Sequence, residues 1–234
     1  MGAPDLAATT TQDVAEQALD EVGDESGERY LTGVLPLFHA QGQPIVTHLT
    51  HDAAIALGVN DRADLMAAEE LRQRRILESH ARAGVTFLAP ASTRVEAQVT
   101  IEADTTIGPG VSLIGDTTVG AGCHIGPHST LIDCRVGGEA KVVQTYAVEA
   151  EIGEGAIVGP FAYLRPGSVL GRGVKVGTFV EIKNSDIGAG SKVPHLSYVG
   201  DATIGTGSNI AGYFFAFDAK KGEQLWKFNT GSGV

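Results

Sequence analysis

The sequence is poor in aromatic residues, cations and cysteines. Aromatic residues make up 6% of the 234 residues, so a core must consist mainly of aliphatic side chains. The 17 Lys and Arg are outnumbered by 28 Asp and Glu, which gives a net charge of −11. Binding to nucleic acid requires clustered cations that contact phosphates, so we expect no nucleic-acid partner.

Other absences bear on location and cross-linking. No apolar run approaches the roughly 20 residues of a transmembrane helix, so we expect no membrane span. The first residues lack the basic and apolar regions of a secretory signal, and we therefore expect a cytoplasmic protein. Cys123 and Cys134 are too few for a disulfide framework, and we expect them to be buried thiols.

Glycine and aliphatic residues are abundant instead. Hydrophobic residues make up 43% of the chain, and glycine occurs 31 times, which indicates a packed core with many tight turns. Patterning divides the chain into an acidic segment (1–29), a helical region (30–84), a repeat region (85–212) and an aromatic-rich tail (213–234). The acidic segment holds eight Asp or Glu against one Arg, so we expect it to be mobile and solvated.

Residues 30–84 predict two helices and one strand. We expect an imperfect helix over 31–41, a strand over 44–49 and a long helix over 61–82. The long helix is rich in Ala, Leu, Glu and Arg, contains neither Pro nor Gly, and has Asn60 where an N-cap residue belongs.

The repeat region has a period of six residues. Its aliphatic series is Val95, Ile101, Ile107, Leu113, Val119, Ile125, Leu131, Val136, Val142, Val148, Ile152, Val158, Leu164, Leu170, Val176, Ile182, Ile187, Val193, Val199, Ile204 and Ile210. Four steps are shorter than six, namely those that end at Val136, Ile152, Ile187 and Ile204. Small residues tend to follow four places later.

A period of six fits neither an isolated strand nor an isolated helix. It predicts a coil with three flat sides, in which each side is one short strand and a tight turn. The aliphatic residues point into the prism, the small residues fit its corners, and each coil covers the edges of the next. About seven coils follow from three hexapeptides per coil.

Three motifs give this region a family resemblance. They are Arg165-Pro166-Gly167, Phe179-Val180-Glu181-Ile182-Lys183 and the run from Gly190 to Asp201 that contains Pro194-His195-Leu196-Ser197-Tyr198. The hexapeptide frame resembles the left-handed parallel β-helix of hexapeptide acyltransferases. The motifs resemble the acetyltransferase domain of the bifunctional N-acetylglucosamine-1-phosphate uridyltransferase/glucosamine-1-phosphate acetyltransferase family, over residues 20–212. The residues that follow Gly58 resemble the end of that family's uridyltransferase domain and its linker helix.

The resemblance implies an activity and a set of site residues. It implies acetyl transfer from acetyl-CoA to glucosamine-1-phosphate, a step of UDP-N-acetylglucosamine synthesis for peptidoglycan of the cell wall, by a homotrimer. His195 matches the general base, and Arg165 and Lys183 match the cations that hold the sugar phosphate. Tyr198 and Asn209 match further sugar-site residues. Asn60 matches a Mg²⁺ ligand of the family's uridyltransferase site.

The chain also departs from the family pattern at both ends. The Gly-rich nucleotide-binding loop is absent, so we expect no uridyl transfer and an incomplete Mg²⁺ site. The later coils, which in the family carry most of the acetyl-CoA pocket, are replaced after Ala211-Gly212. We therefore expect weak or no activity. The alternative is a non-catalytic, truncated β-helix oligomer that at most binds sugar phosphate.

The tail has a different resemblance. Ala216-Phe217-Asp218-Ala219 and the following residues up to Trp226 are similar to one propeller repeat of pyrroloquinoline-quinone-dependent alcohol dehydrogenases. One repeat cannot close a propeller, so no quinone cofactor is implied. We expect an orphan β-hairpin that covers the open end of the prism, in a chimera of two genes joined near residues 212–213.

Two histidines raise an alternative of a different kind. His124 and His128 are compatible with a zinc site, since some hexapeptide proteins are zinc carbonic anhydrases. A third suitably placed histidine is not evident, so we favour surface or packed histidines at these positions.

Overall fold

The fold is described from a computed structural model, in which residues 33–210, 213–217 and 224–229 are placed. The chain divides into two units at Leu57 and Gly58. Within the first unit, α2 spans Val34–Ala40 and the 3-10 helix η2 spans Ala53–Ala56. The strand expected over 44–49 is absent, because these exposed residues have no neighbouring strand with which to form a ladder.

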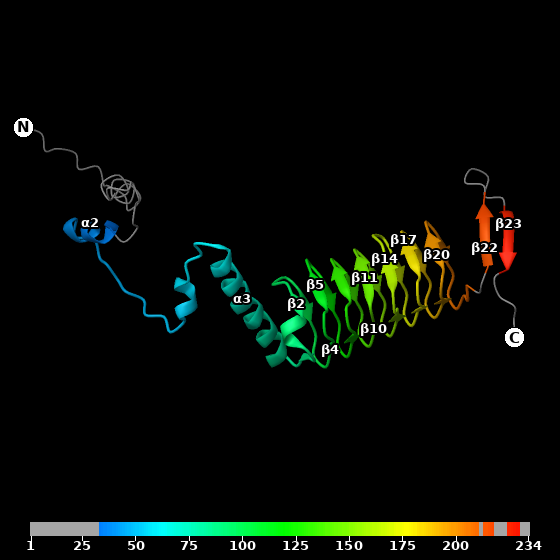
Figure 1. Cartoon of the computed structure of the whole chain (residues 1–234), viewed down its shortest axis with the longest axis horizontal. Coiled ribbons are helices and arrows are strands. Elements are labelled where there is room, and N and C mark those ends of the chain that lie inside the picture. Colours follow the sequence, from blue (N-terminus) through cyan, green and yellow to red (C-terminus); the bar gives the residue numbers. More distant parts are fainter. Residues whose placement is uncertain (1–32, 211–212, 218–223, 230–234) are drawn as a thin grey trace, which may run out of the picture. The chain divides into compact units, whose positions relative to one another are not determined.

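The second unit contains three parallel sheets of seven strands each (Figure 1). Sheet B consists of β1 (Thr86–Phe87), β4 (Thr106–Ile107), β7 (His124–Ile125), β10 (Lys141–Val142), β13 (Ile157–Val158), β16 (Lys175–Val176) and β19 (Lys192–Val193). Sheet C consists of β2 (Arg94–Val95), β5 (Ser112–Ile114), β8 (Thr130–Ile132), β11 (Thr145–Val148), β14 (Ala162–Leu164), β17 (Glu181–Lys183) and β20 (Tyr198–Gly200). Sheet D consists of β3 (Thr100–Ile101), β6 (Thr118–Val119), β9 (Arg135–Val136), β12 (Glu151–Ile152), β15 (Val169–Leu170), β18 (Asp186–Ile187) and β21 (Thr203–Ile204).

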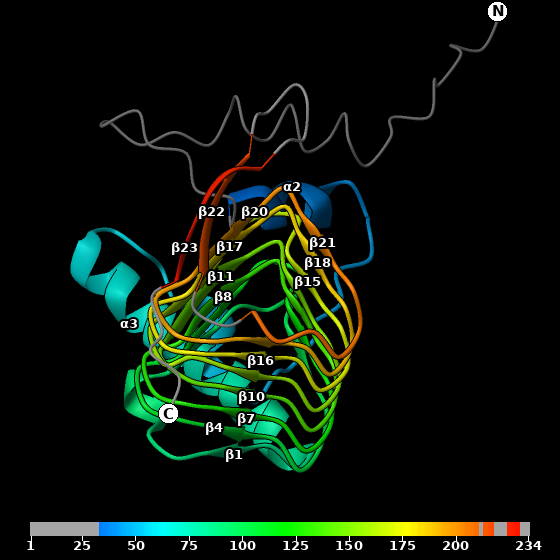
Figure 2. The same ribbon diagram turned by 90° about the vertical axis from the view of Figure 1, so that its right-hand side faces the viewer.

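The three sheets are the sides of a triangular prism (Figure 2). Each coil contributes one strand to sheet B, then one to sheet C and one to sheet D, and about seven coils are stacked. Seen from the end that the chain reaches last, the path from β16 through β17 to β18 runs clockwise towards the viewer (Figure 2), so the β-helix is left-handed. The predicted fold class is confirmed.

The aliphatic series fills the prism, with one correction. Ile107, Leu113 and Ile125 are fully buried, and register partners on successive coils stack on one another. Ile204 and Ile210, at the end of the series, are partly buried against this core. The expectation for Val148 is wrong, because Ala147 is the buried residue there and pairs with Leu131 and Leu164. The period therefore shortens to five on both sides of residue 147.

Each corner turn contains a residue with positive φ, and the turn between β13 and β14 contains two. These residues are Asp104, Gly122, Glu139, Gly155, Gly173, Gly190 and Gly207 between sheets D and B; Gly110, His128, Gln144, Gly159, Phe161, Phe179 and Leu196 between B and C; and Gly115, Asp133, Glu149, Gly167, Asn184 and Asp201 between C and D. Small buried residues fill the corners from inside. Thr105 and Ser191 show their role: each hydroxyl donates to a carbonyl oxygen and accepts an N–H from the next coil.

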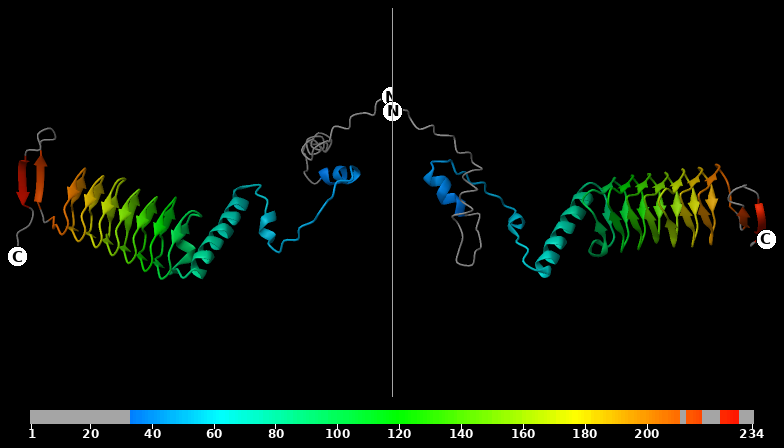
Figure 3. Two further views of the ribbon diagram at one scale, coloured as in Figure 1. Left: turned by 180° about the vertical axis from the view of Figure 1, so that it is seen from behind. Right: turned by 90° about the horizontal axis from the view of Figure 1, so that it is seen from above.

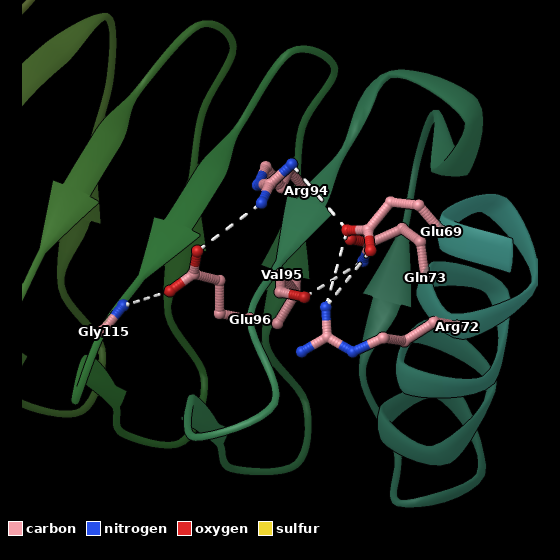
Figure 4. A network of polar contacts seen from close by, with 7 residues as sticks. All are labelled: Glu69, Arg72, Gln73, Arg94, Val95, Glu96 and Gly115. Atoms are coloured by element: carbon pink, nitrogen blue, oxygen red, sulfur yellow. Dashed lines mark hydrogen bonds and ion pairs between the residues drawn. The ribbon is translucent and has the colours of Figure 1, made fainter. Parts of the chain in front are cut away.

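The long helix α3 (Arg62–Arg82) packs against the first coil (Figure 4). Its N-cap is Asp61, not Asn60, because the Asp61 carboxylate accepts the backbone N–H groups of Ala63 and Asp64. Leu77 is buried in the prism core. Gln73 donates to the Val95 carbonyl oxygen over 3.1 Å, which fixes the helix to β2.

An ion-pair network surrounds this contact (Figure 4). Arg94 lies 3.9 Å from Glu69 of α3 and 3.6 Å from Glu96, and Glu96 accepts the backbone N–H of Gly115 on the second coil. The exposed pairs add little stability individually but link helix, first coil and second coil.

The 3-10 helix η3 (Pro90–Ser92) forms the turn before β2.

Both views of Figure 3 show two strands side by side in the tail. The tail contains an antiparallel hairpin of β22 (Tyr213–Phe217) and β23 (Gln224–Asn229). Its side chains, the acidic segment 1–29 and the proposed junction lie outside the described residues, so those expectations stay predictions. Both cysteines are buried, as expected, and burial raises the pKa of each thiol. No helix in the described ranges combines the length and apolarity of a membrane span.

The buried aliphatic row predicts a large effect of truncation. Leu164→Ala removes a side chain that is 0% exposed between Ala147 and Ile182, and we expect a loss of about 2–5 kcal/mol of unfolding free energy. Leu88→Ala is the matched control, because Leu88 is 60% exposed. Urea unfolding followed by circular dichroism measures both, and equal midpoints would contradict an aliphatic core.

Candidate functional site

Two cations lie next to each other at one edge of sheet C. Arg165 follows Leu164, and the register partner of Leu164 is Ile182, which precedes Lys183. The two side chains therefore project from adjacent coils beside the corner between sheets C and D. Each is about two-fifths exposed (39% for Arg165, 38% for Lys183), so both charged ends remain accessible to a ligand.

Each cation has a carboxylate partner. Arg165 donates to Glu181 over 2.9 Å, and this bond raises the pKa of the guanidinium. Lys183 donates to Asp201 over 3.0 Å. Exposed pairs of this kind contribute little stability, so their main effect is to orient the cations.

Asp201 is held by two donors. The Asn184 side chain donates to its second oxygen over 2.9 Å and is the largest cause of the lowered pKa of the Asp201 carboxyl, with Lys183 second. Asn184 and Asp201 also line a shallow hollow of about 350 Å³ together with Gly167, Ser185, Asp186 and Thr203. Asn184 directly follows Lys183 in the sequence, and Asp201 is the ion-pair partner of Lys183, so the hollow adjoins this cation.

Tyr198 reaches towards the same place from the last coil. It is the register partner of Glu181, and its hydroxyl lies over Gly200, which is the register partner of Lys183. A Cβ atom at position 200 would displace this hydroxyl, which is the far end of an exposed side chain. The structure thus brings Arg165, Lys183 and Tyr198 together.

His195 lies at the other edge of sheet C. It is exposed, follows β19 and directly precedes the corner residue Leu196. Within the described ranges, its imidazole has no hydrogen bond or ion pair. The backbone therefore places His195 and Lys183 on opposite edges of the same sheet, with Tyr198 between them, and not in direct contact.

Asn209 belongs to a different side of the prism. It forms a β-bridge with Lys192 of sheet B, so it extends the outer row of that sheet. A single chain does not place Asn209 beside Arg165 or Lys183.

Asn60 lies at the start of α3, far along the chain from the cations. Its backbone N–H and its side-chain amide both donate to Asp64, and the backbone bond is the main reason for the lowered pKa of that carboxyl. No group of three His, Cys, Asp or Glu suited to a metal ion occurs in the described part of the chain. Among the described residues, neither Asn60 nor the pair of His124 and His128 belongs to such a group.

A second, larger groove runs between α3 and the first coil. It has a volume of about 1040 Å³ and an apolar lining that includes Leu65, Met66, Phe87 and Pro90. It lies on the first coil, whereas Arg165 and Lys183 lie on the fifth and sixth. This groove has the character of a packing surface and does not adjoin the cations.

Sequence reasoning missed three members of the cation cluster. Glu181, Asn184 and Asp201 all lie in or beside the quoted motifs, but their role depends on coil register. A usable signal was the separation of 16 to 18 residues between partners, which is one coil. Stacking residues at that separation predicts which acidic side chain meets which cation.

Comparisons with known proteins identify relatives of the β-helical part of the chain. A family model described as "Bacterial transferase hexapeptide (six repeats)" matches residues 98–133 and 149–184. The chain is 52% identical over 162 residues to the Bifunctional protein GlmU of Desulfitobacterium hafniense, covering 69% of this chain and 36% of that protein. It is 55% identical over 162 residues to the Bifunctional protein GlmU of Nocardia farcinica, covering 69% and 33%.

The chain thus spans about a third of the length of the curated relatives it matches. Among solved structures, UDP-N-acetylglucosamine O-acyltransferase from Moraxella catarrhalis is 15% identical with a TM-score of 0.34, covering 52% of this chain and 66% of that one. The sequence similarity agrees with the resemblance read from the motifs.

The cation cluster predicts a change in an acid titration. Because Lys183 helps to stabilise the ionised carboxylate, Lys183→Met should raise the pKa of Asp201 part of the way towards its ordinary value. A carboxyl whose pKa is lowered in the folded state contributes stability that is lost as the pH falls through that pKa. In the variant, the ionised form of Asp201 and its contribution to stability are therefore lost at a higher pH during acidification. Carbon-detected NMR of the carboxyl group measures this. Lys192→Met on sheet B is the control, and an equal shift in both variants would refute the pairing.

Proposed function

We propose that the β-helix is the sugar-phosphate-binding part of a glucosamine-1-phosphate N-acetyltransferase. The observation that carries this proposal is the neighbouring placement of Arg165 and Lys183 beside the Tyr198 hydroxyl. The similarity to the bifunctional relatives supports it over the β-helical part. Because the chain spans about a third of those proteins, their complete activity is not assigned to it.

The cations suit a phosphate ester. A sugar phosphate carries nearly two negative charges, and a planar guanidinium and an ammonium group offer it charge-assisted hydrogen bonds. Glu181 and Asp201 neutralise the two cations in the free protein, so a phosphate group must compete with them. Its three terminal oxygens and greater charge favour the exchange, while the carboxylates keep both cations extended beforehand.

His195 supplies the base in this proposal. The ammonium form of the sugar amine cannot attack a thioester, and imidazole is the side chain whose ordinary pKa lies nearest to neutrality. The ammonium form gives one proton to His195, and the free amine forms the new N–C bond to the acetyl group; the second proton that the nitrogen then loses passes to the leaving sulfur. The thioester C–S bond breaks, and coenzyme A leaves as the thiol.

The finer partners belong to the same proposal. Acetyl-CoA is the acetyl donor, the assembly is a homotrimer, and the location is the cytoplasm. Asn209 contributes to the sugar site from sheet B of a neighbouring copy, since its own chain does not place it by the cations. No uridyl transfer and no Mg²⁺ step is proposed, because the Asn60 amide is engaged with Asp64.

A second candidate function is a non-catalytic oligomer that binds sugar phosphate. The separation of His195 from Lys183 across sheet C favours it, because one chain does not join base and phosphate site. Both candidate functions require that Arg165 and Lys183 bind the sugar phosphate, but only the acetyltransferase turns over acetyl-CoA.

The shared part is tested by calorimetry with glucosamine-1-phosphate. Removing both cations with Arg165→Met and Lys183→Met should weaken binding by at least about 100-fold, because two charge-assisted hydrogen bonds are lost. Lys141→Met on the fourth coil is the matched control and should bind as the unchanged protein does. Equal affinity in the unchanged protein, the double variant and the control would show that Arg165 and Lys183 do not bind the phosphate.

The catalytic part is tested by thiol release from acetyl-CoA in the presence of glucosamine-1-phosphate. We expect slow turnover that falls by about 100-fold or more in His195→Ala, the usual loss when a general base is removed. His128→Ala is the control, because His128 occupies the same type of corner on the third coil. No turnover, or turnover that His195→Ala leaves unchanged, would favour the non-catalytic oligomer.

A further inference from the structure

The shallow hollow beside Lys183 lies on the far side of the cations from sheet C. Its lining combines residues of the corner between sheets C and D with residues at the start of sheet D, including Gly167, Asn184, Asp186, Asp201 and Thr203. Arg165 and Lys183 project from the edge of sheet C next to the same corner. The cations therefore stand between the outer surface of sheet C and the hollow.

The lining of the hollow contains two carboxylates and no cation. Asp201 is the ion-pair partner of Lys183, so its charge is shared with the cation cluster. Asp186 is exposed, and its register partners Val169 and Thr203 carry no charge. Among the residues that the structure describes, none donates to the Asp186 carboxylate. The charge of Asp186 therefore acts on any group that enters the hollow.

The orientation of a bound sugar phosphate follows from the proposed function, on which this inference rests. Tyr198 lies on sheet C and His195 at its far edge, so the sugar ring extends over sheet C when the phosphate is held by Arg165 and Lys183. The terminal oxygens of the phosphate then face away from the sugar, towards the corner and the hollow. A group attached to one of these oxygens enters the hollow.

Two classes of sugar ligand differ at this point. A sugar monophosphate carries nearly two negative charges on one phosphate, and both are available to the cations. A nucleoside-diphosphate sugar divides two charges between two phosphates, so the cations receive only one of them. The second phosphate places the other charge in the hollow, close to Asp186 and to the Asp201 carboxylate that the first phosphate has displaced from Lys183. Like charges at this distance repel.

We propose that Asp186 makes the site selective for sugar monophosphates over nucleoside-diphosphate sugars. The hollow is shallow and has a volume of about 350 Å³, so its size does not exclude a second phosphate and the selection depends on charge. Attraction to Arg165 and Lys183 is available to both classes of ligand, whereas the repulsion acts on only one of them. Specificity of this kind arises from an unfavourable contact with the wrong ligand.

Calorimetry with glucosamine-1-phosphate and UDP-glucosamine tests this proposal. The readout is the ratio of the two dissociation constants, because both ligands carry about two negative charges and a change in the overall charge of the protein largely cancels. We expect the unchanged chain to prefer the monophosphate by at least about 10-fold. Asp186→Asn should reduce this preference about five-fold, the upper range for one interaction between exposed charges, and Asp186→Lys should reduce it further. Added salt should also reduce the preference of the unchanged chain.

Asp116→Asn is the matched control. Asp116 is exposed and follows the corner between sheets C and D on the second coil, away from the cations, so this variant should keep the ratio of the unchanged chain. Circular dichroism checks the fold of each variant. A ratio that Asp186→Asn leaves unchanged, or equal affinity of the unchanged chain for both ligands, would overturn the selectivity and leave the sugar-phosphate site in place. An unchanged chain that binds neither ligand would overturn the proposed function and this inference together.

Discussion

Stacking of inward-facing aliphatic side chains from one coil to the next is the interaction on which the rest of this molecule depends. Each coil buries about one aliphatic residue per side, and no coil has a core of its own. The hydrophobic effect therefore acts only between neighbours, so the stack must be continuous to be stable. The continuity fixes register, and register decides which surface residues become neighbours.

The surface chemistry follows from that register. Arg165 meets Glu181, and Lys183 meets Asp201, because each pair is separated by one coil of chain. A coil shortened by one residue keeps its aliphatic row only if a corner tightens, as at Gln144 and Glu149 on either side of Ala147. Because a tightened corner absorbs the missing residue, side chains at irregular sequence spacing still form straight columns on the outer surface of the prism.

The prism also explains why one chain holds only part of the site. Its three sides face in different directions, so residues on sheet B and residues on sheet C cannot face one another within a copy. Arg165, Lys183 and Tyr198 share one side, whereas Asn209 lies on another and His195 at the edge between them.

The coil architecture, the identity of nearly all inward-facing residues and the long helix after Asp61 could be predicted from the residues alone, because a period of six and helix-forming composition are local signals. The sequence also pointed to Arg165, Lys183 and His195 through their motifs. The folded chain was needed to show that Ala147 replaces Val148 in the core, that Asp61 caps the helix, and that residues 44–49 form no strand. It was also needed to show that Glu181, Asn184 and Asp201 surround the cations. The reason is that these outcomes depend on contacts between residues a coil or more apart, or on the presence of a neighbouring strand, and neither is encoded in the local pattern.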